Sequence, residues 1–178
     1  MSLLARYRFN NDLKDVMGGT DLVPSGGSMS WSADGIGGTC VYAVSRSFAT
    51  PIIPPYTTSD ISYSGWFWFP KSAMAPVIEG ASVTASATTP TGNLIGNDSY
   101  GGLGLIWESN QIYKDGSTKN SLTNIYVRAN IRSNNQNNTT GNVTVPFNGW
   151  HHLAITYSQT TKTLKLYLDG ALASQCTV

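Results

Sequence analysis

The stretch Trp150-His-His-Leu-Ala-Ile-Thr-Tyr157 is followed, after a short loop, by Thr163-Leu-Lys-Leu-Tyr-Leu-Asp-Gly170. Each segment has the residue content of a β-strand. Asp169-Gly170 is the strongest short hairpin signal in the chain, because a type I′ turn needs positive φ at both of its central residues. We therefore expect two strands here, with a tight turn at residues 169–170.

Several other segments predict strands through a two-residue alternation. In residues 60–69, Trp66 and Trp68 would share one face, opposite Ile61, Tyr63, Gly65, Phe67 and Phe69. Further strands are predicted at residues 3–10, at about 39–44, at 102–108 and at 123–132, whereas 133–142 has the composition of an exposed polar loop. Residues 18–38 are expected to form short irregular pieces around Trp31. Many short strands with turn signals between them predict an all-β sandwich or barrel.

Composition supports the same fold class and excludes several partners. The 178 residues fit one domain, and only 12 % of them are charged, so polarity comes from Ser, Thr, Asn and 18 Gly. A net charge of +1 without any basic run argues against nucleic acid as a partner. The N-terminus has no signal-peptide pattern, and no apolar run is long enough for membrane insertion. Without a sign of secretion, Cys40 and Cys176 are expected to be free thiols, with a disulfide as the less favoured alternative.

Three pieces of the chain resemble the laminin-G-like, concanavalin A-like jelly-roll superfamily. Leu3-Leu-Ala-Arg-Tyr-Arg-Phe-Asn-Asn-Asp-Leu-Lys-Asp15 looks like an opening strand and its loop, and Asp34-Gly-Ile-Gly-Gly-Thr-Cys-Val-Tyr42 is similar to the Gly-rich start of the second strand. The third and most specific piece is the pair of segments at 150–157 and 164–170. The strand at 61–69 fits the place of the family's aromatic core strand. The middle of the chain, residues 70–148, carries little of the resemblance.

The resemblance implies one two-sheet antiparallel jelly-roll sandwich over residues 1–178. Family members usually continue after the hairpin with a last strand that pairs beside the first, whereas this sequence stops at Val178. Either that strand is missing from this chain, or something else covers the edge. An uncovered edge invites pairing with another chain. We therefore expect other protein subunits as partners, through residues 3–10 and 171–178.

Catalysis is not expected, although many jelly rolls of this shape are glycanases. A glycosidase needs two carboxyls flanking the bond, and the sequence has only two glutamates, Glu79 and Glu108, without a Glu-X-Asp-X-Glu run. His151 and His152 are adjacent in a strand and point to opposite faces, which argues against a shared metal. Their expected role is structural, with one hydrogen-bonded and half-buried and the other at the surface. We therefore name no catalytic residue.

No metal or cofactor site is predicted either. Some laminin-G-like domains bind calcium, and oxygen ligands are plentiful at Asn97, Asp98 and Asp115. However, no loop has an ordered spacing of such ligands.

Trp66, Trp68 and Trp107 are the candidate ligand-binding residues. Aromatic rings suit the apolar faces of sugars, with Asn, Asp and Tyr supplying directional hydrogen bonds. The competing interpretation is that tryptophans on central strands belong to the sandwich core, and for each tryptophan taken alone we favour the core.

The hypothesis that the sequence favours is a non-enzymatic structural or recognition domain of a larger assembly. Low charge, abundant Ser, Thr, Asn and Gly, and the absence of an export signal are typical of a bacteriophage virion protein, such as a head decoration, fibre or tail-associated subunit made in the host cytoplasm. The alternative is a carbohydrate-binding module for a cell-surface glycan, and a glycoside hydrolase is the weakest alternative. The first two are compatible, because a virion protein can carry a glycan site.

Overall fold

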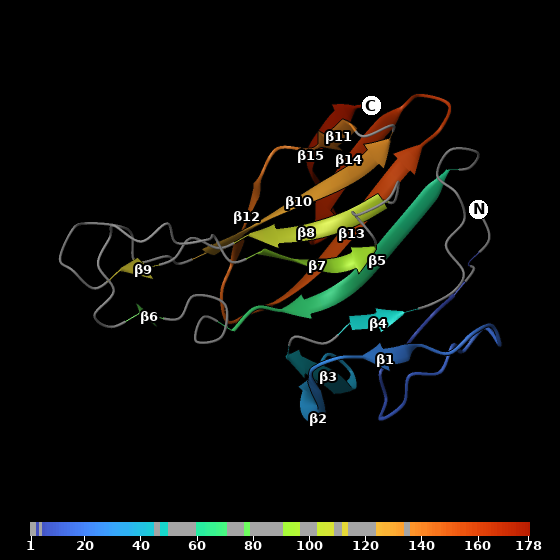
Figure 1. Cartoon of the computed structure of the whole chain (residues 1–178), viewed down its shortest axis with the longest axis vertical. Coiled ribbons are helices and arrows are strands. Elements are labelled where there is room, and N and C mark those ends of the chain that lie inside the picture. The colour runs from blue at the N-terminus through green and yellow to red at the C-terminus, as the bar shows by residue number, and fades with distance from the viewer. Residues whose placement is uncertain are drawn as a thin grey trace. The chain divides into compact units, whose positions relative to one another are not determined.

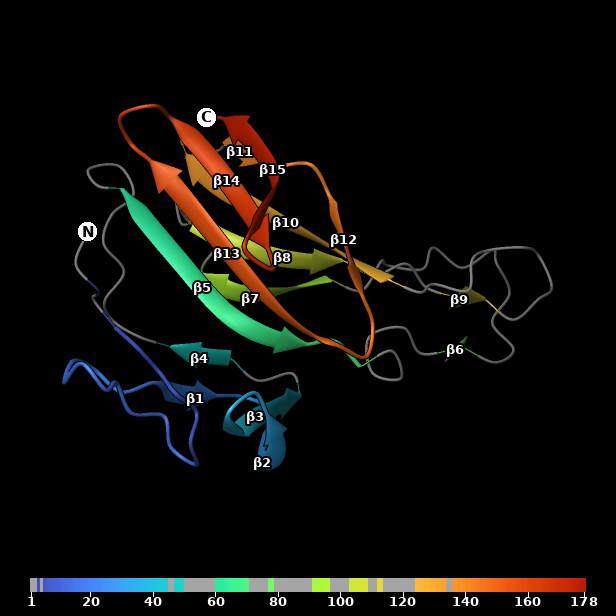
Figure 2. The same cartoon turned by 180° about the vertical axis from the view of Figure 1, so that it is seen from behind.

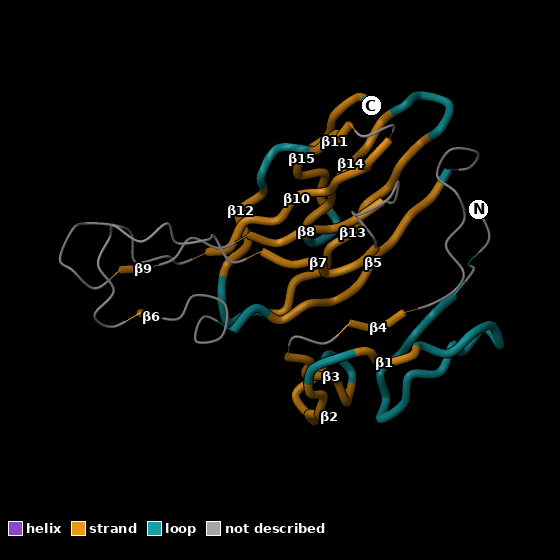
Figure 3. Tube along the Cα trace, viewed as in Figure 1, coloured by secondary structure: helices purple, strands orange, loops and turns teal. Residues whose placement is uncertain are grey.

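A computed structural model describes residues 3, 5–44, 47–49, 60–70, 77–78, 91–96, 103–108, 112–113, 124–133 and 136–178. Every regular element among these residues is a β-strand (Figure 3), which confirms the predicted all-β class. The chain divides into two compact units, Met1–Pro54 and Pro55–Val178, which we describe separately. A single domain over residues 1–178 stays a prediction. In the described part of the chain, no helix has the length and apolarity to cross a membrane.

The second unit contains a four-stranded antiparallel sheet built from β15, β14, β13 and β5 in that order (Figure 2). Its strands are β5 (Ile61–Trp68), β13 (Trp150–Ser158), β14 (Thr163–Leu168) and β15 (Ala171–Thr177). The predicted strands at 60–69 and 150–157 and the strand before the predicted turn are therefore confirmed. The pairing of β5 with β13 joins segments that lie far apart in the sequence.

The predicted tight turn between β14 and β15 is also confirmed. Asp169 has φ 49° and Gly170 has φ 84°, so both central residues adopt the left-handed conformation that a type I′ turn requires. Leu168 and Ala171 pair directly across the turn. The glycine is needed here because a side chain at this φ would strain the backbone.

A five-stranded sheet forms the other layer of the second unit (Figure 1). Its strands follow the order β11 (Gln136–Thr139), β10 (Asn124–Ser133), β8 (Leu103–Glu108) and β7 (Thr91–Gly96), with β12 (Val143–Pro146) also paired to β10. β8 and β10 confirm the strands predicted at 102–108 and 123–132. A short parallel pair, β6 (Val77–Ile78) and β9 (Ile112–Tyr113), is separate from both sheets.

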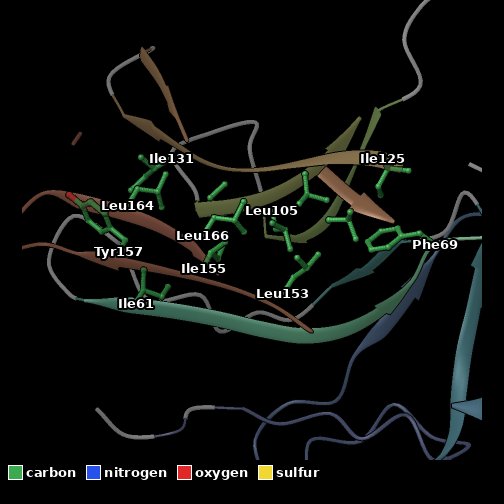
Figure 4. Packing of buried hydrophobic residues seen from close by; sticks show 13 residues of the cluster. Ile61, Phe69, Leu105, Ile125, Ile131, Leu153, Ile155, Tyr157, Leu164 and Leu166 are labelled. Carbon is green, nitrogen blue, oxygen red and sulfur yellow. The ribbon is translucent and has the colours of Figure 1, made fainter. Parts of the chain in front are cut away.

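The hydrophobic core lies between these two sheets (Figure 4). Alternate residues of the central strands supply most of it, as the two-residue period requires. From the four-stranded sheet come Leu153, Ile155, Leu164 and Leu166, and from the five-stranded sheet come Leu105, Ile125, Val127, Ala129 and Ile131, all fully buried. The second unit is therefore a two-layer β-sandwich.

The predicted polar loop at 133–142 is partly wrong, because residues 136–139 fold back as β11 against β10. Polar contacts hold this hairpin together. The side-chain amide of Asn130 donates to Asn137 Oδ1 at 2.9 Å, and the backbone N–H of Ala129 donates to the buried hydroxyl of Thr140 at 3.0 Å. Such a strand carries no alternation of apolar residues, so its sequence resembles that of a loop.

The first unit contains two antiparallel pairs. β1 (Val23–Ser25) pairs with β4 (Ser47–Ala49), and β2 (Ser28–Gly35) pairs with β3 (Gly38–Val44). The strand predicted at about 39–44 is confirmed by β3. The irregular structure predicted around Trp31 is wrong for this residue, which lies within β2.

The strand predicted at residues 3–10 is wrong for the residues that the structure describes. Only an isolated bridge between Tyr7 and Asp15 forms there. Positive φ at Phe9 turns the chain, and the buried carboxylate of Asp15 accepts the backbone N–H groups of Arg6, Met17 and Gly19. These hydrogen bonds lower the pKa of Asp15, with the bond from Arg6 as the largest cause. The Asp15 side chain thus accepts the backbone N–H of Arg6, which would otherwise be available for pairing in a sheet.

Candidate functional site

The candidate site lies on the outer face of the four-stranded sheet, the face turned away from the core. Along β5, burial alternates residue by residue, with Ile61 buried and Trp66 and Trp68 exposed. The relative exposure is 52 % for Trp66 and 45 % for Trp68. The predicted division of this strand into two faces is therefore correct, whereas a core position is wrong for these two tryptophans. The reason is that Ile61 and Phe69 already occupy the core side of the strand.

β13 brings two more rings to the same place. Trp150 pairs with Trp68, and His152 pairs with Trp66. The ring centroids lie 5.9 Å apart in the first pair and 5.2 Å apart in the second, and both pairs are tilted. These distances lie within the range of favourable aromatic contacts. We call the four side chains Trp66, Trp68, Trp150 and His152 the aromatic face.

Sequence reasoning did not assign Trp150 and His152 to this site. The signal was present, because residues 150 and 152 alternate with the buried Leu153, Ile155 and Tyr157 and so belong to the outer face. What was missing was the long-range pairing of β13 with β5. Without it, nothing in the sequence places these rings beside Trp66 and Trp68.

The third predicted residue, Trp107, is not brought to the aromatic face by its strand. It lies in β8, which belongs to the five-stranded sheet, and its backbone pairs with Val127. The side chain of Trp107 lies outside the part that the structure describes.

The outer face of the four-stranded sheet is aromatic at one end of the strands and polar at the other. Next to the aromatic face, Tyr167 pairs with Ala154 and with Leu172, which is 51 % exposed. Further along, Lys165 pairs with Thr156 and Gln175. An open hollow of about 390 Å³ lies at this polar end, lined by Thr161, Thr163, Lys165, Gln175, Cys176 and Thr177.

Asp169 ties the β14–β15 turn to the first residues of β13. Its carboxylate oxygen Oδ2 lies 2.9 Å from Nδ1 of His151, and Oδ1 accepts the backbone N–H of His152 at 2.9 Å. The backbone N–H of Asp169 in turn donates to the carbonyl of His152 at 2.8 Å. Both backbone hydrogen-bonding groups of His152 are therefore held by one residue, which makes Asp169 a positioning residue for the aromatic face.

The two histidines have separate surroundings. His151 is held by Asp169 and its side chain is 15 % exposed, whereas the ring of His152 lies against Trp66. In the described part of the chain, no three His, Cys, Asp or Glu residues are grouped as a metal site would require.

The hydrogen bond from His151 is the main cause that lowers the pKa of the Asp169 carboxyl below its ordinary value of 3.8. A carboxyl with a lowered pKa in the folded state adds stability above its unfolded pKa, and that stability is lost as the pH falls through the folded pKa. We therefore expect Asp169→Asn, which keeps the turn preference, to lower the free energy of unfolding by less than about 1 kcal/mol at about pH 5, because the group is half exposed. Urea unfolding should show this difference shrink as the pH falls below 3.8, the ordinary pKa of the carboxyl. A difference that stays constant over this range would contradict the assignment.

Several other sequence candidates lie outside the described residues or side chains. These are Glu79, Asn97, Asp98, Asp115 and the side chain of Glu108. Cys40 and Cys176 are both free thiols, as expected, and burial raises the pKa of the Cys176 thiol.

Comparison with known proteins identifies the fold independently of the site. A laminin G-like family model, described as the concanavalin A-like lectin/glucanases superfamily, matches residues 46–178. The match includes the specific 150–170 segments and the strand at 61–69, and it begins after the two weaker N-terminal pieces. No curated protein and no solved structure gives a significant match to the chain.

Proposed function

We propose that this chain, which belongs to the concanavalin A-like lectin/glucanases superfamily, is a non-enzymatic recognition domain that binds carbohydrate on its aromatic face. The observation that carries the proposal is the exposure of Trp66 and Trp68 beside Trp150 and His152. Several large apolar rings that lie together on a protein surface commonly mark an interaction site, whereas single exposed apolar residues do not.

The chemistry of the face suits sugars. The C–H faces of pyranose rings are apolar and stack on aromatic side chains, while their hydroxyls need directional hydrogen bonds. Serine, threonine and tyrosine side chains lie along the same outer face, at Ser62, Ser64, Thr156 and Tyr167. An apolar platform bordered by hydroxyl groups therefore supports recognition of a carbohydrate over that of a purely apolar ligand.

Binding without hydrolysis is supported by the residues around the platform. A glycosidase places two carboxyls about 5–10 Å apart across the bond. Among the described outer-face positions of β5, β13, β14 and β15, none is Asp or Glu. The carboxylate of Asp169, at the neighbouring turn, is engaged by His151 and by the backbone of His152.

The test is binding of purified residues 1–178 to a broad glycan array, with the mass in solution recorded on the same sample. Saturable binding to one class of sugar is the expected result. A blank array from a sample that is folded by circular dichroism would refute the carbohydrate proposal.

A second candidate function is assembly with other subunits, in a bacteriophage virion as the composition suggests. The observation that favours it is β15, an edge strand of the four-stranded sheet as far as the sheet is described, with Leu172 exposed. An edge strand offers backbone groups for pairing with another chain. The proposal rests on residues 171–178, because residues 3–10 form no strand in the described structure. A solution mass above that of one chain would support it, and a strictly monomeric mass at high concentration would count against self-assembly.

A further inference from the structure

The outer face of the four-stranded sheet holds its aromatic rings and its charge at different positions along the strands. His152 and Thr156 both lie on β13, and four residues of strand separate them by about 13 Å. Lys165 pairs with Thr156 across the sheet. A ligand that reaches from the aromatic face to Lys165 therefore spans several sugar rings.

Lys165 is the one Lys or Arg among the described outer-face positions of these four strands, and none of those positions holds Asp or Glu. It also lines the hollow of about 390 Å³, where its neighbours are hydroxyl, amide and thiol side chains. None of the described residues that line the hollow is Asp or Glu, and the carboxylate of Asp60, the residue before β5, accepts the backbone N–H of Gln159 at 2.6 Å. The hollow thus offers one cation and several neutral donors, which complement an anionic group.

We propose that the ligand is an acidic oligosaccharide. Its ring faces stack on the aromatic face, and a carboxylate or sulfate on a ring further along the chain binds the Lys165 ammonium in the hollow. The inference rests on the proposed function and deepens it, because it names the class of sugar. A charge-assisted hydrogen bond from lysine to such an anion is stronger than a neutral one and adds selectivity for the charged glycan.

The arrangement favours an acidic glycan over single-stranded nucleic acid, which also stacks on aromatic rings. Nucleic acid carries a charge on every nucleotide and is bound in grooves lined by many basic side chains. This face offers a single lysine, and the chain has a net charge of +1. One isolated anion on an otherwise neutral sugar chain matches it better.

The experiment takes each acidic glycan of the array that the protein binds and compares the affinity of the protein for this glycan with its affinity for the neutralised form. In the neutralised form, carboxylates are methyl-esterified or sulfates are removed. Affinities are measured at 50 and 200 mM NaCl for the unaltered chain, Lys165→Gln and Lys14→Gln. Lys14 is the matched control, because it is an exposed lysine in the first unit, outside the four-stranded sheet. At 50 mM NaCl, the unaltered chain and the control should bind the acidic form roughly tenfold more tightly than the neutralised form, as a charge-assisted hydrogen bond implies. Lys165→Gln should bind both forms equally.

The outcomes separate the two proposals. Binding of neutral glycans alone, or discrimination that survives Lys165→Gln, would overturn the acidic ligand and leave carbohydrate binding intact. An array that is blank for the folded chain would overturn both. A poly-U or poly-dT oligomer bound as tightly as the acidic glycan would replace the sugar by single-stranded nucleic acid.

Discussion

Replacing Trp66 and Trp68 together by alanine is expected to weaken carbohydrate binding by at least about a hundredfold, since buried aromatic anchors at binding sites commonly contribute about 2 kcal/mol or more each. Both side chains are about half exposed in the free protein, so their loss removes little from the core. The free energy of unfolding should therefore change by less than about 1 kcal/mol. Isothermal titration with the glycan selected on the array measures the binding, and urea unfolding of the same samples measures the stability.

Two controls give this result its meaning. Trp66→Phe with Trp68→Phe keeps a stacking surface at each position and should retain more of the affinity than the alanine pair. Leu172→Ala removes an equally exposed apolar side chain from the same outer face, beside Tyr167 and outside the aromatic face. Affinity that is unchanged in the alanine pair would remove the aromatic face from the binding site.

Leu166→Ala is expected to give the largest loss of stability, about 3 kcal/mol, within the range for deleting a fully buried leucine. Leu166 has no exposed surface and lies in β14 between Ile155 and Ser174, where it points into the space between the two sheets. Alanine would leave a cavity there, because the neighbouring strands are fixed by their hydrogen bonds and close it only in part. The shift of the midpoint of urea unfolding, followed by tryptophan fluorescence, measures the change.

The same leucine-to-alanine change on the outer face serves as the comparison. Leu172→Ala in the adjacent strand should alter the free energy of unfolding by no more than about 0.5 kcal/mol, because its side chain is already half in water. Equal effects at positions 166 and 172 would mean that the two-layer sandwich is assigned wrongly.

The sequence predicted the fold where side chains alternate or a turn has special backbone angles. Ile61 to Phe69 alternates strictly, and the structure places its two sets on opposite faces. Asp169-Gly170 predicted its own turn conformation. Prediction failed where polar contacts replace this pattern. β11 pairs with β10 although its residues are all polar, and a side-chain hydrogen bond from Asn130 to Asn137 adds to the pairing. The carboxylate of Asp15 accepts a backbone N–H of the predicted first strand.

The candidate site was predictable only in part. Alternation indicates that Trp66 and Trp68 share a face, yet the same pattern fits a face packed in a core or one in water. Trp150 and His152 join them only through the pairing of β13 with β5, which depends on the assembled sandwich. The sequence contains no local signal for a partner that far along the chain.

The pairing of β5 with β13 also affects the stage of folding at which the protein can bind its ligand. β13, β14 and β15 are joined by short local turns, so this meander has a low loop-closure cost and we expect it to form early. The pairing of β5 with β13 closes a long stretch of chain, so we expect it to form late. Since the four rings come together only across this pair, a newly made chain has no assembled platform until the sandwich is nearly complete. Only the fully folded molecules in a preparation are therefore expected to bind ligand. A partly folded fraction would lower the measured number of binding sites per chain without changing the affinity of each site.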